Sequence, residues 1–272
     1  MKKRLAMVLA VTLLATTVFV GCGSKDNSSD KSSKKEYTEK KSGDKFTVGF
    51  DQDFPPMGFV GDDGEFTGFD LEMAAEVAKR LNLTIAYQPI AWDAKDMELD
   101  AGTIDCIWNG FTMNGREDDY EWSKPYMKNN QVFVVRGDSD INSEADLAGK
   151  NVEVQTDSSA EAALNDNSEL TSTFGSLTPV ADYNTAFMDL ESGAVDAIAM
   201  DDVVASYQIT SRKADFKVLD DVIAAEEYGI GFKKGNTGLR DKVQATLEEM
   251  AADGTAAKIS EKWFGKDITT IQ

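Results

Sequence analysis

The sequence predicts an α/β fold with two similar halves, because one pattern occurs twice and because strands alternate with helices. The pattern Leu, acid, any residue, Gly, any residue, β-branched, Asp, any residue, Ile begins at Leu99 and again at Leu190. Each copy is typical of a helix that ends on a left-handed glycine and leads into a strand. An aromatic residue and a methionine precede both leucines at matching distances: Trp92 and Met97 in the first copy, Tyr183 and Met188 in the second. A generic helix-to-strand turn would explain the glycines alone, whereas the matched upstream residues favour two related halves.

The spacing of apolar residues predicts strands and helices in alternation along the chain. The first half is expected to hold strands at 46–50, 83–87, 103–108 and 132–135, and helices at 70–81 and 93–101. The second half is expected to hold strands at 151–154, 179–182, 195–200 and 227–232, and helices beginning at 159, near 184 and at 202, before an amphipathic C-terminal helix. Asp70, Asp93 and Asn184 are the expected N-caps of their helices. Such alternation favours mostly parallel sheets with helices on both faces.

Polar residues follow both repeat strands. Residues 109–112 (Asn-Gly-Phe-Thr) come after the first strand, and Asp201 and Asp202 come after the second. In open α/β sheets, ligands bind beyond the carboxyl ends of the strands. The repeat therefore predicts a cleft in which two complementary faces meet one ligand.

The N-terminus predicts an exported, lipid-anchored protein. A basic start at residues 2–4, an apolar run at 5–20 and the pair Gly21-Cys22 are typical of an export signal. A cysteine after a small residue resembles a bacterial lipobox, which implies cleavage before Cys22 and attachment of lipid to it. We expect residues 1–21 to be a signal peptide and 22–45 a flexible tether, because residues 23–44 contain almost no large apolar side chain. The expected location is the outer face of the cell membrane of a Gram-positive bacterium.

The composition excludes several kinds of chemistry. The chain has no histidine, which removes Ser-His and Cys-His nucleophiles and the commonest zinc ligand. Apolar neighbours predict that Cys106 lies in a buried strand, and lipid on Cys22 would leave it without a disulfide partner. The formal net charge of −20 repels nucleic acid and anionic membrane. We expect no cofactor, no metal ion, no catalytic residue and no nucleic-acid partner.

Several stretches between residues 46 and 265 carry a specific resemblance to one protein family. They are VGFDQDFPPM at 48–57, GFDLE at 68–72, GFTM at 110–113 followed by Arg116, DAIAMD at 196–201, YGIGF at 228–232 and ISEKWFG at 259–265. Together they resemble the polar amino-acid-binding proteins of ABC importers.

The resemblance implies a two-lobed, type II periplasmic-binding-protein-like fold, in which two mixed sheets flanked by helices are joined by two crossover hinge strands. Lobe I would comprise 46–130 and 228–272, and lobe II 131–227, with crossings near 130–134 and 227–231. The expected function is that of a monomeric, lipid-anchored receptor that binds a free polar amino acid between its lobes and delivers it to an ABC permease.

Four positions are candidates for holding the charged ends of an amino acid. The resemblance assigns Arg116 to the carboxylate, since a guanidinium donates two parallel hydrogen bonds, and Asp201 to the ammonium. A surface ion pair for Arg116 and a helix cap for Asp201 are the alternatives. Gly110 allows close backbone approach, and Thr112 offers a hydroxyl and an amide. The turn from Thr112 to Arg116 is one residue shorter than in the family and would be rebuilt around 114–115.

The start of a helix and the pocket walls supply the remaining candidates. Ser158 and Ser159 open a helix whose amide groups suit a carboxylate, although Ser158 followed by Glu161 is also a capping pattern. The walls and the groups that read the ligand's side chain are expected to be Phe54, Trp92, Asp51 and Gln155, with Trp108 and Asp53 as further candidates.

The chemistry of Asp51 decides the expected ligand. An aspartate facing the cleft favours a basic or amide side chain, because an unpaired buried carboxylate is costly. If Asp51 instead bonds the turn at 54–57, cystine or a neutral amino acid becomes the candidate. Two other functions remain open: a dehydratase-like enzyme on the same fold, with Asp51 or Asp53 as its acid, and the sensor part of a receptor.

Overall fold

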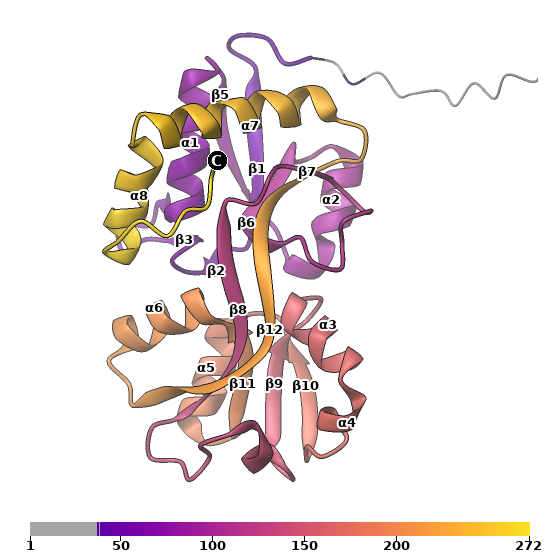
Figure 1. The fold of residues 1–272 in the computed structure, drawn as a ribbon, viewed down its shortest axis with the longest axis vertical. Coiled ribbons are helices and arrows are strands. Elements are labelled where there is room, and N and C mark those ends of the chain that lie inside the picture. The colour runs from indigo at the N-terminus through magenta and orange to yellow at the C-terminus, as the bar shows by residue number, and fades with distance from the viewer. Residues whose placement is uncertain (1–36, 38) are drawn as a thin grey trace, which may run out of the picture. The chain divides into compact units, whose positions relative to one another are not determined.

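The computed structural model describes Tyr37 and residues 39–272. The predicted signal peptide, Cys22 and the tether up to residue 36 lie outside the described residues. No helix in this part of the chain is long and apolar enough to cross a membrane. From Lys45 onward, strands and helices build the two lobes drawn at the top and the bottom of Figure 1.

Nine strands of the described chain form one mixed sheet in the order β10-β9-β11-β8-β12-β6-β1-β5, with β7 beside β12. The upper lobe contains β1 (Lys45–Phe50), β5 (Thr84–Pro89), β6 (Cys106–Thr112) and β7 (Glu121–Trp122). The lower lobe contains β9 (Asn151–Gln155), β10 (Ser176–Val180) and β11 (Ala197–Asp201). The long strands β8 (Met127–Arg136) and β12 (Phe216–Phe232) run through both lobes. The α/β class is confirmed. The two expected mixed sheets are joined into one, because β8 and β12 belong to both halves.

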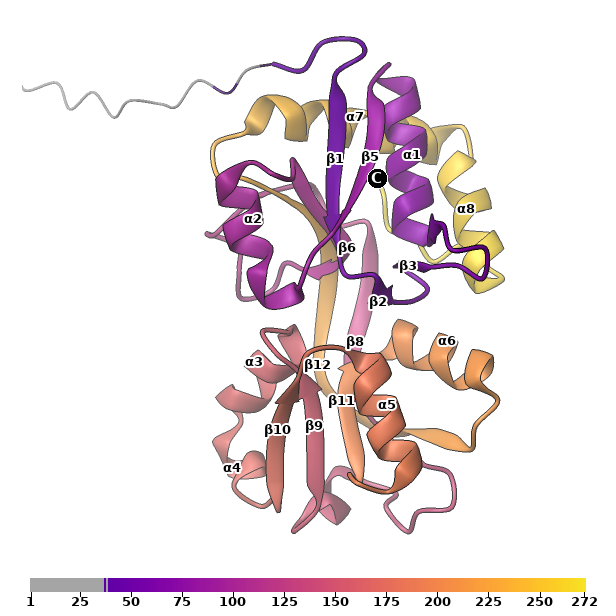
Figure 2. The ribbon, with the colours of Figure 1, turned by 180° about the vertical axis from the view of Figure 1, so that it is seen from behind.

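Helices cover both faces of the sheet in each lobe (Figure 2). In the upper lobe they are α1 (Phe69–Arg80), α7 (Thr237–Ala252) and α8 (Thr255–Phe264) on one side, and α2 (Lys95–Ala101) after the 3-10 turn η1 (Trp92–Ala94) on the other. In the lower lobe they are α3 (Ser159–Asp166) and α4 (Ser168–Thr171) on one side, and α5 (Tyr183–Ser192) and α6 (Asp202–Arg212) on the other, with the 3-10 turn η2 (Glu144–Leu147) after β8. A small antiparallel sheet of β2 (Asp53–Phe54), β3 (Gly58–Val60) and β4 (Phe66–Thr67) lies in the upper lobe.

The two lobes are joined by a short two-stranded ribbon. β8 pairs with β11 from Gln131 onward, and β12 pairs with β6 from Tyr228 onward. Residues 128–130 and 225–227 therefore belong to no strand ladder except the one they form with each other. Glu227 is also tied to the turn after β6, because its carbonyl accepts from the Met113 amide at 2.9 Å and its amide donates to the Asn114 side chain at 2.8 Å. The predicted crossings at 130–134 and 227–231 were placed slightly too far along the chain, because their later residues are already bonded into β11 and β6.

The repeat appears as α2 leading into β6 and α5 leading into β11. Gly102 and Gly193 occupy the C-cap positions with φ of 77° and 80°, which confirms the predicted left-handed glycines. Each strand carries the polar residues that follow it to the edge facing the other lobe (Figure 1).

The predicted N-caps of the repeat helices are wrong. Asp182, not Asn184, caps α5, because its side chain precedes the helix and accepts a hydrogen bond from the Thr185 amide at 2.8 Å. Asn184 lies inside the helix and donates to the Asp53 carboxylate at 2.8 Å. Asp93 lies within η1, so α2 begins without a side-chain cap.

Asp70 does not cap α1 either. Gly68 holds the N-cap with φ of 143°, and a Cβ at this position would lie 2.3 Å from the Met57 carbonyl oxygen. Asp70 is instead fully buried and accepts hydrogen bonds from the Gly110 amide at 2.6 Å and the Tyr126 hydroxyl at 2.9 Å. The sequence pattern missed this because both donors are distant in the chain.

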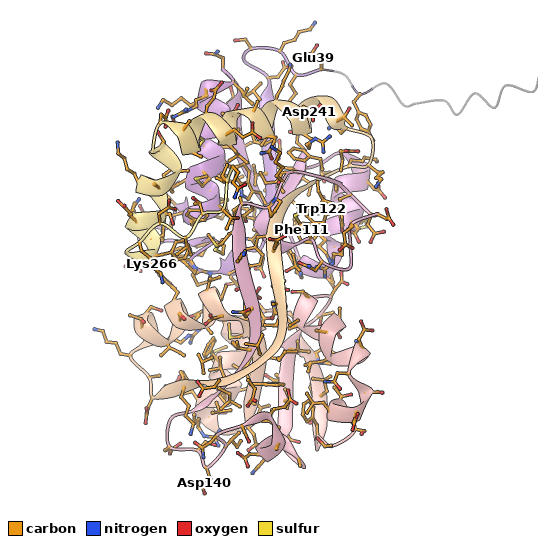
Figure 3. All side chains as sticks on the ribbon, in the orientation of Figure 1. Glu39, Phe111, Trp122, Asp140, Asp241 and Lys266 are labelled. Carbon is orange, nitrogen blue, oxygen red and sulfur yellow. The ribbon has the colours of Figure 1, made fainter. Side chains whose placement is uncertain are left out.

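Aromatic side chains form a compact part of the upper core. Phe111 and Trp122, which lie close together in Figure 3, have ring centroids 4.8 Å apart. Trp92 packs edge-on against Phe111 at 5.4 Å, and Tyr120 packs against both Phe111 and Trp122. The predicted burial of Cys106 in β6 is confirmed. This cluster supports the floor of the upper lobe where it faces the cleft.

Candidate functional site

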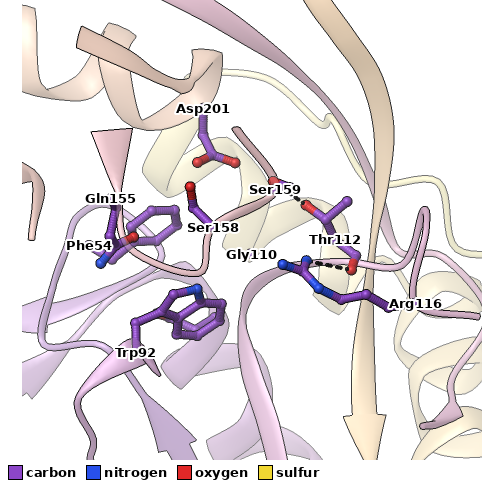
Figure 4. Close-up of a pocket in the computed structure, with 10 residues that line it drawn as sticks. Phe54, Trp92, Gly110, Thr112, Arg116, Gln155, Ser158, Ser159 and Asp201 are labelled. Carbon is purple, nitrogen blue, oxygen red and sulfur yellow. Dashed lines mark hydrogen bonds between the residues drawn. The ribbon is translucent and has the colours of Figure 1, made fainter. Parts of the chain in front are cut away.

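One pocket between the lobes gathers the predicted site residues except Asp51 and the further candidates Asp53 and Trp108 (Figure 4). Its empty volume is about 280 Å³. The upper lobe contributes Phe54 from β2, Trp92 from η1, Asn109, Gly110 and Thr112 from β6, and Arg116 from the next turn. The lower lobe contributes Gln155 at the end of β9, Ser158 and Ser159 at the start of α3, and Asp201 at the end of β11.

A tight turn aims Arg116 at the pocket. The Arg116 amide donates to the Met113 carbonyl at 3.0 Å, and Gly115 takes φ of 79°, so the short turn closes around this glycine. The guanidinium lies 5.4 Å from the centroid of the Phe111 ring and donates to the Thr112 carbonyl at 3.3 Å. Its planar face is supported and part of its donor capacity remains for an anion in the pocket.

The start of α3 faces Arg116 from the lower lobe. The Ser158 hydroxyl accepts from the Glu161 amide at 3.1 Å, so the predicted cap forms. The Ser159 hydroxyl accepts from the Thr112 hydroxyl at 3.1 Å across the lobes (Figure 4). Amide groups at a helix start carry partial positive charge, and they adjoin the guanidinium here.

Asp201 is buried at the opposite side of the pocket and does not cap α6 with its side chain. Its Oδ1 atom accepts from the amide groups of Asn129 and Gln131, each at 2.8 Å, and from the Tyr228 hydroxyl at 2.5 Å. The same two amide groups donate to Glu226 Oε1 at 2.7 Å. Burial, followed by the neighbouring Glu226 carboxylate, raises the pKa of Asp201. A cation beside this pair would relieve both effects.

The partners of Asp201 were missed by sequence reasoning. Asn129, Gln131, Glu226 and Tyr228 come from the two crossing strands, which meet β11 only through long-range pairing. No spacing along the chain signals this contact.

Asp51 lies outside the main pocket. Its carboxylate accepts from the Asp53 amide at 2.8 Å and from the Gln155 side-chain amide at 2.6 Å. Burial raises the pKa of Asp51 to about 6. The Asp51 side chain borders an adjoining cleft that is also lined by Asp53, Asp93 and Asp182. The structure thus links Asp51 to the site through Gln155.

The remaining candidates divide between wall and core. Phe54 and Trp92 line the pocket, whereas Trp108 is fully buried and packs against Tyr126 with ring centroids 6.2 Å apart. Gly110 has φ of 57°, and a Cβ there would lie 3.0 Å from the Phe54 ring. Among the described residues, no cluster of His, Cys, Asp and Glu is arranged to hold a metal ion.

Comparisons with known proteins agree on one family. A family model described as bacterial extracellular solute-binding proteins, family 3, matches residues 46–266. The L-cystine-binding protein TcyJ of Escherichia coli (strain K12) is 33% identical over 225 residues, which cover 82% of this chain and 83% of that protein.

Solved structures show the same fold. The substrate-binding protein of an ABC uptake transporter from Streptococcus pneumoniae, with bound histidine, is 35% identical with a TM-score of 0.81, covering 83% of this chain and 94% of that one. An ancestral arginine-binding protein bound to arginine is 35% identical with a TM-score of 0.76, covering 83% and 100%.

Proposed function

Because the chain belongs to the bacterial extracellular solute-binding proteins of family 3, we propose that it binds one free amino acid between its lobes and delivers it to an ABC permease. The observation that carries the proposal is a single pocket with a guanidinium on one side and a buried carboxylate on the other. Arg116 comes from the upper lobe and Asp201 from the lower. A zwitterion matches this pair of charges.

Each end of the amino acid has its own set of partners. Arg116 donates to the carboxylate, together with the Ser159 amide at the start of α3. The Thr112 hydroxyl joins them by turning its proton from the Ser159 hydroxyl to the carboxylate. Asp201 accepts from the ammonium, whose positive charge offsets the repulsion between the Asp201 and Glu226 carboxylates. The Phe54 and Trp92 rings and the Gly110 backbone enclose the stem of the amino acid.

The relatives are named as binding proteins of transporters rather than as enzymes, as expected. We propose lobe I to comprise 46–130 with 228–272 and lobe II 131–227, closing as a monomer around the amino acid. Membership of an extracellular family supports export. The Gly21-Cys22 pair supports lipid attachment at Cys22, which would hold the receptor on the outer face of the cell membrane of a Gram-positive bacterium.

The side chain of the amino acid is proposed to be basic or to carry an amide. Four carboxylates border the cleft next to the pocket, and Gln155 connects that cleft to the binding site. A cationic side chain that passes Gln155 would enter a strongly negative region.

Cystine is the second candidate. The hydrogen bond from the Asp53 amide turns Asp51 toward its own turn, which leaves a less charged pocket wall. TcyJ is named for cystine, while other relatives are named for or bound to arginine, glutamine or histidine.

A thermal-shift panel tests the proposal. The protein is unfolded, dialysed and refolded to remove any bound amino acid, and its melting temperature is then measured with each of the twenty amino acids and with cystine. Stabilisation by arginine, lysine, histidine or glutamine supports the first candidate, and stabilisation by cystine alone supports the second. Stabilisation chiefly by leucine, isoleucine or valine would overturn the proposed polar specificity, and no stabilisation by any of them would overturn the function.

A further inference from the structure

We propose that Lys95 and Asp157 form an ion pair across the cleft that holds the lobes together over the bound amino acid and slows its release. The inference rests on the proposed function. Lys95 begins α2 in the upper lobe, and Asp157 precedes α3 in the lower lobe. The Lys95 ammonium contacts the Asp157 carboxylate directly and lies 3.4 Å from the Asp157 carbonyl oxygen.

Lys95 is held in a position that only the lower lobe completes. Its side chain is 2% exposed, and the Trp92 carbonyl oxygen lies 3.4 Å from its ammonium. The ammonium also lies 5.3 Å from the centroid of the Trp92 ring. Among the described residues, Asp157 is the only carboxylate paired with this buried ammonium. When the lobes separate, the Lys95 ammonium loses its carboxylate partner, and only water replaces that interaction.

The backbone of Asp157 indicates that its side chain is used. Asp157 takes φ of 59°, in the left-handed region where glycine is favoured. The Glu161 carboxylate accepts from the Asp157 amide at 2.6 Å, and Arg116 donates to the Asp157 carbonyl at 3.3 Å. Both of these bonds use backbone atoms of residue 157, so glycine could make them equally well. What aspartate adds at this position is the carboxylate that contacts Lys95.

The ion pair forms only when the lobes meet, which fixes its kinetic effect. An amino acid enters an open cleft, where Lys95 and Asp157 are apart, so the pair contributes little to the association rate. It must break before the amino acid leaves, so the pair lowers the dissociation rate. Most differences in affinity between variants of one binding site arise from changes in the dissociation rate. Neither Lys95 nor Asp157 lines the pocket, and Lys95 reaches it only through the Trp92 ring, so the pair acts on closure and does not contact the ligand.

The test uses Asp157→Gly, Lys95→Met and the double variant. Glycine keeps the left-handed backbone while removing the carboxylate, and methionine keeps most of the apolar stem of lysine. Lys124→Met is the matched control, because Lys124 pairs with Glu248 within the upper lobe. The probe is the amino acid that stabilises the wild type most in the panel, and stopped-flow fluorescence gives its association and dissociation rates at low and high salt.

We expect each single variant to raise the dissociation rate about tenfold at low salt and to change the association rate by less than about twofold. The double variant should release no faster than the single variants, because one interaction is lost in all three. High salt should bring the dissociation rates of the variants and the wild type closer together, because salt screens the ion pair. Lys124→Met should match the wild type.

Unchanged dissociation rates in folded single variants, or additive effects in the double variant, would overturn the ion pair while leaving the proposed function intact. Circular dichroism at the temperature of the kinetic measurements shows whether each variant is folded. Asp157→Asn, which tolerates the same backbone, gives a second route to the result if Asp157→Gly is poorly folded. Failure of wild type to bind any amino acid would instead overturn the proposed function and the ion pair's role together.

Discussion

Arg116 and Asp201 are the residues whose replacement tests the proposed binding mode most directly. Arg116→Ala and Asp201→Asn should each weaken binding of the preferred amino acid by roughly 2–5 kcal/mol, the usual cost of removing one partner from a buried, hydrogen-bonded charge pair. Titration calorimetry measures the loss. Asp202→Asn is the matched control, because Asp202 follows Asp201 but does not line the pocket. Near-native affinity in Arg116→Ala or Asp201→Asn would contradict the assignment of that residue.

At the scale of single residues, short motifs predicted those site residues whose position depends on their neighbours in the chain. Arg116 lies in a turn, Gly110 near the end of a strand and Ser158 at a helix start; the chemistry of each is set by its neighbours in the chain, and the structure places all three at the pocket. Glu226 could not be predicted, because its contact with Asp201 depends on two strands that pair only after the chain has folded. Lys95 was missed for the same reason, since its partner lies in the other lobe.

At the scale of elements, the repeated helix–glycine–strand unit makes a prediction about stability. Gly102→Ala and Gly193→Ala should each lower the free energy of unfolding by about 1–2 kcal/mol, because an L-residue pays this much in the left-handed conformation. No atom crowds either position closely enough to add a clash. Urea denaturation followed by circular dichroism measures the change.

Gly238→Ala is the control for the glycine variants. Gly238 lies in the first turn of α7 without a positive φ, and a Cβ there would meet no atom within 4 Å. Its replacement should leave stability unchanged or raise it by a few tenths of a kcal/mol. If all three variants behaved alike, the left-handed caps would not be the cause.

Helix α1 carries a pH-sensitive group at its start. Burial raises the pKa of Asp70 in the folded protein to about 7, above the 3.8 that is usual for a free carboxyl. The folded state therefore favours the protonated form, and this contribution to stability is complete below about pH 4 and is lost as the pH rises through 7. Asp70→Asn cannot ionise, so it lacks this loss.

The contribution of Asp70 is isolated by comparing how steeply the free energy of unfolding changes with pH in the wild type and in Asp70→Asn. Unfolding free energies of wild type and Asp70→Asn are measured between pH 5 and pH 8 under identical conditions. The variant should gain on the wild type by roughly 2–4 kcal/mol across this range, following the shift of about three pKa units. Its side-chain amide adds a constant offset that does not alter the slope. Parallel curves would show that Asp70 ionises normally in the fold.

At the scale of the whole molecule, the duplicated pattern predicted an α/β fold with two similar halves, and the family resemblance implied that these halves are two lobes joined by two strands. The exact crossing points were less accessible. Strand pairing decides where β8 leaves one lobe for the other, and the continuous apolar run at 132–135 does not show where its pairing with β11 begins. The small sheet of β2, β3 and β4 escaped prediction because its strands are two or three residues long.

The ribbon between the lobes predicts a change of shape on binding. Residues 129–130 and 225–226 form a strand ladder only with each other, so bending there disturbs no third strand. Contacts that span the lobes, such as Gln155 with Asp51 and Asn184 with Asp53, are hydrogen bonds between side chains. They can part without disrupting either core.

Small-angle scattering tests the hinge. The stripped protein should have a larger radius of gyration than the same protein saturated with its preferred amino acid, because Arg116 and Asp201 converge on one molecule only when the lobes approach. Asp201→Asn at the same amino-acid concentration should keep the profile of the stripped protein. If calorimetry shows saturation of the wild type while its scattering profile does not change, binding proceeds without closure. The ribbon would then be a fixed strut, and Lys95 and Asp157 would be paired in both states.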